Sequence, residues 1–159
     1  MQIEPQDLPI ERLERSVDLA APADRVWPQI GGFLSIVDWH PALASGEVLE
    51  IAGRPHRRVT TTYGAPVLER LEAEGERMLQ VAVVESLLPL EHHRATLRCD
   101  PRPGGCRVTW SAEFRSPSPR AGAIIANIHE LGLAALAGRF GAMPASGTSP
   151  CASGYARAS

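Results

Sequence analysis

The segment from Ser118 to Phe140 constrains the fold most, because it is the longest predicted helix in the chain. Ser118 can serve as its N-cap, and Pro119 suits the first helical position. Gly141 is placed to end the helix in a left-handed cap. One side of the helical wheel is apolar and carries Ile124, Ile125, Ile128, Leu131, Gly132 and Ala135. The small residues on this side, Gly132 and Ala135, either let a sheet come close or leave space for something that is not protein.

Almost everything upstream of this helix has the alternation of β-strands. Residues 12–20 alternate apolar and charged side chains, which predicts a strand with one buried face. Two short helices are predicted next, over 21–31 and 33–39, and Pro28 should shorten or bend the first of them. Six further strands are predicted at 43–51, 57–63, 67–73, 78–85, 92–99 and 107–115. This order predicts an α+β fold, a seven-stranded antiparallel sheet wrapped around the long C-terminal helix.

Length and composition indicate one domain with loose ends. The chain has 159 residues, and we expect the domain over 11–141, a loose arm over 1–10 and a disordered Ala/Ser/Gly/Pro tail over 142–159. The net charge is −2, so no basic surface for nucleic acid or membrane is evident. The N-terminus has no apolar core of a signal peptide, and we expect no apolar run to be long enough to cross a membrane. We therefore expect a soluble, cytoplasmic monomer or homodimer.

The three cysteines leave two interpretations open. Cys99 and Cys106 flank a Pro-Gly-Gly turn and could face each other across a hairpin as a disulfide. They could equally be two reduced, half-buried thiols of a cytosolic protein, which is the interpretation we favour. Cys151 lies in the tail and looks incidental, and no spacing suggests a metal site or another cofactor.

Several short strings, in their order and spacing, resemble the START-like polyketide cyclase/dehydrase (SRPBCC) superfamily. They are Ala21-Pro22-Ala23-Asp24-Arg25-Val26-Trp27, Trp39-His40-Pro41, Glu69-Arg70-Leu71, Glu85-Ser86-Leu87-Leu88-Pro89, Arg107-Val108-Thr109-Trp110 and Gly132-Leu133-Ala134-Ala135-Leu136. Pro28 departs from the helical residue usual at its position. The resemblance implies the helix-grip fold, with a cavity between sheet and helix that binds an apolar small molecule such as a lipid, hormone or polyketide. Some members cyclise or dehydrate what they bind.

The alternation of each strand predicts which polar side chains enter such a cavity. The apolar faces each carry one polar group, namely Tyr63, Glu69, Glu85 or His93. Carboxylates, an imidazole and a phenol in an apolar pocket are suited to general acid/base chemistry. We therefore predict Glu69, Glu85 and His93 as catalytic groups. The predicted ligand-binding residues are Trp39, His40, Tyr63, Trp110, Ile128, Gly132 and Ala135.

Each of these assignments has a simpler alternative. A β-bulge reverses the faces of a strand, and would turn Glu69 or Glu85 out to solvent. Either glutamate could instead pair with an arginine such as Arg70 or Arg94. His93 could be a hydrogen-bonded wall residue, and the tryptophans could belong to the core. The sequence therefore favours binding of an apolar small molecule and leaves open whether the protein also catalyses a cyclisation or dehydration, acts as a carrier or sensor, or is an interaction module.

Overall fold

The computed structural model describes residues 7–144, which form seven strands and three helices. Their bounds are β1 (Glu11–Leu19), α1 (Ala23–Ile30), α2 (Ile36–Trp39), β2 (Leu43–Ile51), β3 (Arg54–Thr61), β4 (Pro66–Gly75), β5 (Met78–Glu85), β6 (Glu91–Arg102), β7 (Gly105–Arg115) and α3 (Ala121–Phe140). The loose arm predicted over 1–10 falls mostly outside the described residues, and so does the predicted tail, with Cys151.

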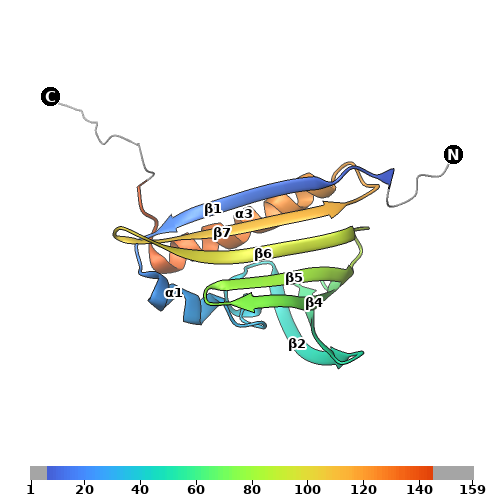
Figure 1. Ribbon diagram of the computed structural model, residues 1–159, viewed down its shortest axis with the longest axis horizontal. Coiled ribbons are helices and arrows are strands. Elements are labelled where there is room, and N and C mark those ends of the chain that lie inside the picture. The colour runs from blue at the N-terminus through green and yellow to red at the C-terminus, as the bar shows by residue number, and fades with distance from the viewer. Residues whose placement is uncertain (1–6, 145–159) are drawn as a thin grey trace.

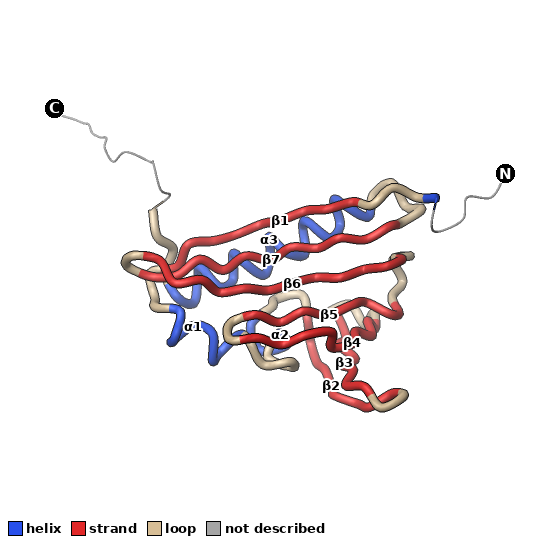
Figure 2. The backbone as a smooth tube through the Cα atoms, in the orientation of Figure 1, coloured by secondary structure: helices blue, strands red, loops and turns tan. Residues whose placement is uncertain are grey.

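All seven strands belong to one antiparallel sheet in the order β1-β7-β6-β5-β4-β3-β2. Figure 1 shows α3 lying along β1 and β7, while β2 runs steeply across the direction of these strands at the other edge. The tube in Figure 2 shows the same curvature, with α2 in the space that the bend encloses. The predicted α+β fold, a seven-stranded sheet wrapped around one long helix, is confirmed.

The core lies between the concave face of this sheet and the three helices. One core cluster contains Leu19, Val108 and Leu136, which are completely buried, together with Val26 of α1. A second cluster joins Phe114 of β7 to α3 and to the inner residues of β5 and β6. Each fully buried aliphatic or aromatic side chain contributes about 1.5–3 kcal/mol relative to an exposed one. Residues of both clusters line the cavity of the candidate site.

The long helix begins three residues later than predicted. Ser118 does not cap it: the Ser118 Oγ accepts a hydrogen bond from the Arg120 N–H at 3.3 Å, and the Ser118 carbonyl accepts one from the Ala121 N–H. These bonds form a turn that leads into α3 at Ala121. At the other end Gly141 stops the helix with a φ of +84°, but its ψ of 126° lies outside the left-handed helical region.

The buried face of α3 also differs from the predicted one. Its buried residues are Ala121, Ile125, Ala126, His129, Gly132, Leu133, Leu136 and Phe140. Ile124, Ile128 and Leu131 of the predicted face are 39–43% exposed. The helix is apolar on nearly every side, so the pattern alone could not fix the rotation. By length and composition α3 could even cross a membrane, contrary to our expectation that no apolar run is long enough; here it is the core helix of the domain.

The short helices are shorter than predicted. α1 spans eight residues and contains Pro28, consistent with the expected shortening. α2 is a single turn, since residues 33–35 form turns before it. Cys99 and Cys106 are free thiols, both completely buried, so the disulfide interpretation is wrong. Burial raises the pKa of Cys99 to about 12, which keeps this thiol protonated and unreactive.

Candidate ligand-binding site

A cavity of about 220 Å³ opens between the concave face of the sheet, α2, α3 and the loop that joins β5 to β6. Its apolar walls come from Leu43, Val59, Val67, Val81, Val83, Leu88, Leu90, Ile124, Ile125 and Ile128. Among them stand the side chains of Arg57, Glu69, His93 and His129. An apolar, concave site with a few convergent polar groups is the usual form of a small-molecule site. The volume is smaller than the 300–1,000 Å³ typical of such pockets, because aromatic rings fill part of the space beside α3.

Large apolar side chains surround the mouth of the cavity. Tyr63, in the turn after β3, is 81% exposed, and Leu87, in the loop after β5, is 79% exposed. Ile124 and Ile128 of α3 complete this rim and remain partly exposed. Tyr63 thus contributes to the entrance, and its predicted place on the inner strand face is wrong, since β3 ends at Thr61.

The most buried charges of the site are an ion pair between neighbouring strands. Arg57 of β3 lies opposite Glu69 of β4, and its Nε donates to Glu69 Oε1 at 2.7 Å. The Arg57 side chain is 3% exposed and that of Glu69 14%. Arg57 also donates through Nη1 to the carbonyl oxygen of Phe33 and lies over the Phe33 ring. Glu69 therefore pairs with Arg57 and not with Arg70 or Arg94, and its Oε2 atom takes part in no bond with the described residues.

His93 of β6 is buried, and its tautomer follows from its one hydrogen bond. The Val83 N–H donates to His93 Nδ1 at 2.9 Å, so Nδ1 is an acceptor and the proton of the neutral ring is on Nε2. Burial lowers the pKa of His93, and the nearby Glu69 opposes this shift. Among the described residues Nε2–H has no acceptor, which leaves it available as a donor in the cavity.

Gly132 lets an aromatic cluster pack against α3 rather than leaving room for a ligand. A Cβ atom at this position would stand 2.7 Å from His40 Cδ2, 2.9 Å from the Trp110 ring and 3.0 Å from the Trp39 ring. His40 is buried, its Nε2 bonds the Ile128 carbonyl oxygen at 2.8 Å, and its Nδ1 accepts from the Ala42 N–H. Burial lowers its pKa. Of the two proposed uses of the small residue, close packing is the one observed.

His129 is a buried group of the cavity for which the sequence pattern predicts no role. Its ring stacks on that of Trp110, with centroids 4.1 Å apart and planes 3° apart. Burial lowers its pKa to about 4, a hydrogen bond with the Trp110 backbone opposes this, and charge on His93 or His40 would lower it further. His129 Nδ1 is buried and has no hydrogen-bond partner among the described residues. His129 lies four residues after Ile125 and three before Gly132, so helical periodicity places it on the same face as these two buried residues.

The structure brings together some of the predicted site residues and separates others. Glu69, His93, His40, Tyr63, Trp110 and Ile128 all line the cavity. Glu85 does not, contrary to the prediction, and is exposed. A bulge shifts the register, since Leu68 pairs with Glu85 but Glu69 pairs with Val83, and the extra residue reverses the end of β5.

Three predicted ligand contacts also lie outside the cavity lining, namely Gly132, which packs against the aromatic cluster, Ala135 and Trp39. Ala135 is half-buried on α3, beyond the wall of the cavity. Trp39 is buried instead against a small separate void, and its Nε1 has no partner among the described residues. Within residues 7–144 no three His, Cys, Asp or Glu side chains are grouped to hold a metal ion, and independence from metals and cofactors remains a prediction.

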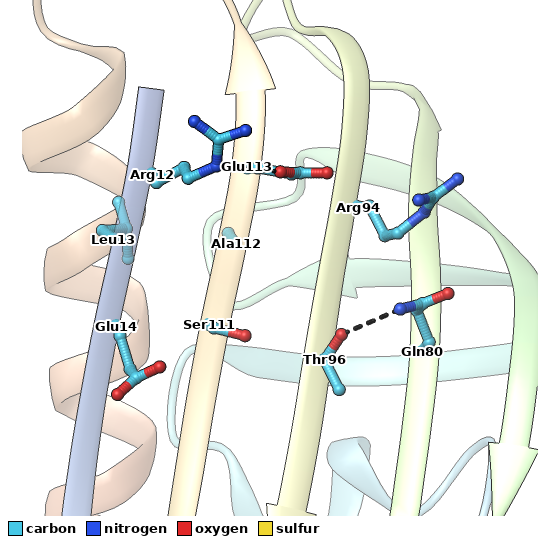
Figure 3. Close-up of a pocket in the computed structure, with 9 residues that line it drawn as sticks. All are labelled: Arg12, Leu13, Glu14, Gln80, Arg94, Thr96, Ser111, Ala112 and Glu113. Carbon is cyan, nitrogen blue, oxygen red and sulfur yellow. Dashed lines mark hydrogen bonds and ion pairs between the residues drawn. The ribbon is translucent and has the colours of Figure 1, made fainter. Parts of the chain in front are cut away.

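A second depression lies on the opposite face of the sheet, and Figure 3 shows its side chains. Ser111 and Glu113 alternate with the buried Trp110 and Ala112, so they point away from α3. Here Arg12 pairs with Glu113 at 3.2 Å, and Gln80 donates to Thr96 at 3.1 Å. The groove is open and lined by exposed or half-buried polar groups, of which Arg12, Glu113, Gln80 and Thr96 are paired. It is a solvated sheet surface, and the candidate site is the apolar cavity.

Fold and cavity together define the helix-grip class, and comparisons with known proteins give the family. Residues 11–141 match the family described as polyketide cyclase / dehydrase and lipid transport, and the chain belongs to this family. A search of curated proteins finds no match.

Solved structures agree with this assignment. The protein XoxI from Bacillus cereus is 26% identical, with a TM-score of 0.75 over 81% of this chain and 94% of that one. A protein from Thermobifida fusca is 33% identical, with a TM-score of 0.69 over 82% and 93%. The Zhui aromatase/cyclase from a Streptomyces species has a TM-score of 0.70 over 82% and 93%, but at 18% identity it supports the fold alone.

Proposed function

We propose that this protein binds an apolar, carbonyl-bearing small molecule, polyketide- or lipid-like, in the cavity between sheet and α3. The observation that carries the proposal is a largely apolar cavity with a buried polar cluster, Arg57, Glu69 and His93, in its wall. Apolar walls favour an apolar ligand, while Arg57 Nη2 and His93 Nε2, which have no acceptor within residues 7–144, favour one with an oxygen acceptor. The family to which the chain belongs includes lipid transport in its description.

A second candidate function, cyclisation through an enolate, is favoured by the placing of Glu69. Its Oε2 is free to take a proton from the carbon next to a bound carbonyl, while Oε1 stays with Arg57. His93 Nε2–H would donate to the carbonyl oxygen as negative charge develops there. In this scheme Glu69 is the base and His93 the hydrogen-bond donor, because its tautomer offers no free lone pair. Glu85 has no part, since it lies outside the cavity.

The test compares two matched substitutions on neighbouring strands. Glu69→Gln keeps the shape and removes the base, whereas Glu85→Gln makes the same change at an exposed position. If Glu69 is the base, we expect turnover of a poly-β-keto substrate to fall at least about 100-fold in the first variant only. Binding of the substrate should change little.

The control arm is circular dichroism, which must show that both variants are folded at the assay temperature. Equal turnover by the wild type and Glu69→Gln would contradict the assignment of Glu69 as the base. Binding without any turnover by the wild type would leave a non-catalytic carrier or sensor. The cytoplasmic location and the monomeric or dimeric state stay predictions.

A further inference from the structure

A small void lies next to the cavity, behind one of its walls. A void of about 20 Å³ is enclosed by α1, α2 and strands β3, β5, β6 and β7. It shares five lining residues with the main cavity, namely Ile36, Arg57, Val81, Ala95 and Trp110. The two spaces are therefore adjacent, and the large side chains of Trp110 and Arg57 stand in the partition between them.

Trp110 is held in this partition from several sides. His129 stacks on its ring at 4.1 Å, and the rings of Trp39 and His40 lie 5.7 and 5.9 Å from it, both steeply inclined. The missing Cβ of Gly132 provides the room for this cluster. A ring packed in this way is a fixed wall rather than a mobile gate, because interiors are close-packed and resist displacement.

The polar and apolar groups of the cavity are separated along its depth. Arg57 is 3% exposed at the partition, and its partner Glu69 and His93 are also largely buried. The mouth, in contrast, is lined by the exposed apolar side chains of Tyr63 and Leu87. The free donors are thus deep, and the apolar surface continues outward to solvent.

We propose that Trp110 and Arg57 form the closed end of the cavity and that the ligand is a neutral, single-chain compound bound with its carbonyl end innermost. The carbonyl oxygen accepts from Arg57 Nη2 or His93 Nε2, and the alkyl chain runs to the mouth. Trp110 is then the residue that limits the size of the group on the inner side of the carbonyl. This inference rests on the proposed function, since it needs the cavity to bind a ligand.

The test is competition of ketones against an apolar fluorescent probe such as Nile red. A series of 2-alkanones of increasing length should bind about fourfold more tightly per added methylene and then reach a limit. Each 2-alkanone is compared with the symmetric ketone of the same carbon number. We expect the 2-alkanone to bind more tightly, because only this isomer puts its oxygen at the closed end with the whole chain toward the mouth.

The closed end is tested with Trp110→Leu, which opens the partition behind the carbonyl. We expect its preference for the 2-alkanone over the symmetric isomer to be smaller than that of the wild type, because the inner side of the carbonyl can then hold a longer alkyl group. Trp27→Leu makes the same change in α1, outside the cavity lining, and should keep the wild-type preference. If Trp110→Leu does not fold, Ala95→Val narrows the partition from β6 and should increase this preference.

The outcomes separate the two proposals. Ketone binding with equal affinity for both isomers, or an isomer preference unchanged in Trp110→Leu or Ala95→Val, would overturn the closed-end assignment and leave the binding function standing. Failure of the folded wild type to bind the probe or any ketone would overturn both.

Discussion

At the scale of single residues, the pair Arg57–Glu69 is the main buried electrostatic interaction of the site. Glu69→Gln leaves the buried guanidinium without a counter-charge, and breaking a buried pair in this way typically costs about 3–5 kcal/mol. We expect a loss in unfolding free energy near the lower end, about 3 kcal/mol, because the glutamine oxygen can still accept from Arg57 Nε. Urea unfolding followed by circular dichroism measures it.

The control for this prediction is the exposed pair Arg58–Glu47 on the same edge of the sheet, with a separation of 3.3 Å and side chains 41% and 65% exposed. Glu47→Gln should change stability by at most about 1 kcal/mol. Equal effects of the two substitutions would mean that burial adds nothing to the pair in the cavity.

The lowered pKa of His129 predicts that the free energy of unfolding decreases in acid. Its pKa is lowered from 6.5 to about 4 in the folded protein, so the unfolded chain binds more protons between these values. The contribution of the neutral His129 to the free energy of unfolding is fully present above about pH 6.5 and is lost as the pH falls toward 4. The contribution reaches about 3 kcal/mol, and His40 and His93, whose pKa values are also lowered, add in the same direction.

Unfolding by urea at pH 7.5 and pH 4.5 measures this loss. His129→Phe keeps a flat ring against Trp110 and removes the titration, so the difference between the two pH values should shrink. His92→Asn alters an exposed histidine with a φ of +53°, which asparagine tolerates, and should leave the difference unchanged. An unchanged difference in His129→Phe would contradict the buried neutral imidazole.

At the scale of elements, two glycines of α3 test how the helix meets the sheet. Gly132→Ala places a Cβ within 3.0 Å of three rigid rings, and we expect overpacking of about 1–3 kcal/mol to exceed the gain in helix propensity. Gly138 has no atom within 4 Å of such a Cβ, so Gly138→Ala should stabilise the protein by about 0.4–1 kcal/mol. Thermal melts of both variants measure the change in melting temperature. Stabilisation by both substitutions would contradict the prediction, because it would show that the aromatic rings move aside for the new Cβ at little cost.

Local patterns predicted the elements well, but not how they face one another. Alternation along Trp110 and His93 identified the inner faces of β7 and β6, because β7 is regular and the bulge of β6, between Glu91 and Arg94, leaves the alternation from His93 onward intact. The same argument failed at Glu85, since a single-residue bulge is a property of strand pairing and leaves no mark in the strand's own sequence. α3 is apolar on too many sides for its pattern to fix its rotation, and so His129 was missed.

Arg57 shows a different limit of sequence reasoning. It shares a strand face with Val59, two residues further on, but charged side chains are seldom buried, so alternation alone does not predict its place in the cavity. Its burial depends on Glu69 across β4 and on the Phe33 carbonyl from the segment before α2. These partners come together only in the folded sheet.

At the scale of the whole molecule, the account depends on a cavity that is open to an apolar ligand. The most direct measurement is a titration with Nile red of the wild type and two valine substitutions. Val67→Trp fills the cavity from β4, whereas Val48→Trp makes the same change at an exposed position of β2 outside the lining. We predict saturable binding by the wild type and Val48→Trp, and at least a tenfold weaker affinity in Val67→Trp while it remains folded. Equal affinity in all three proteins, or no binding by the wild type, would contradict the central claim.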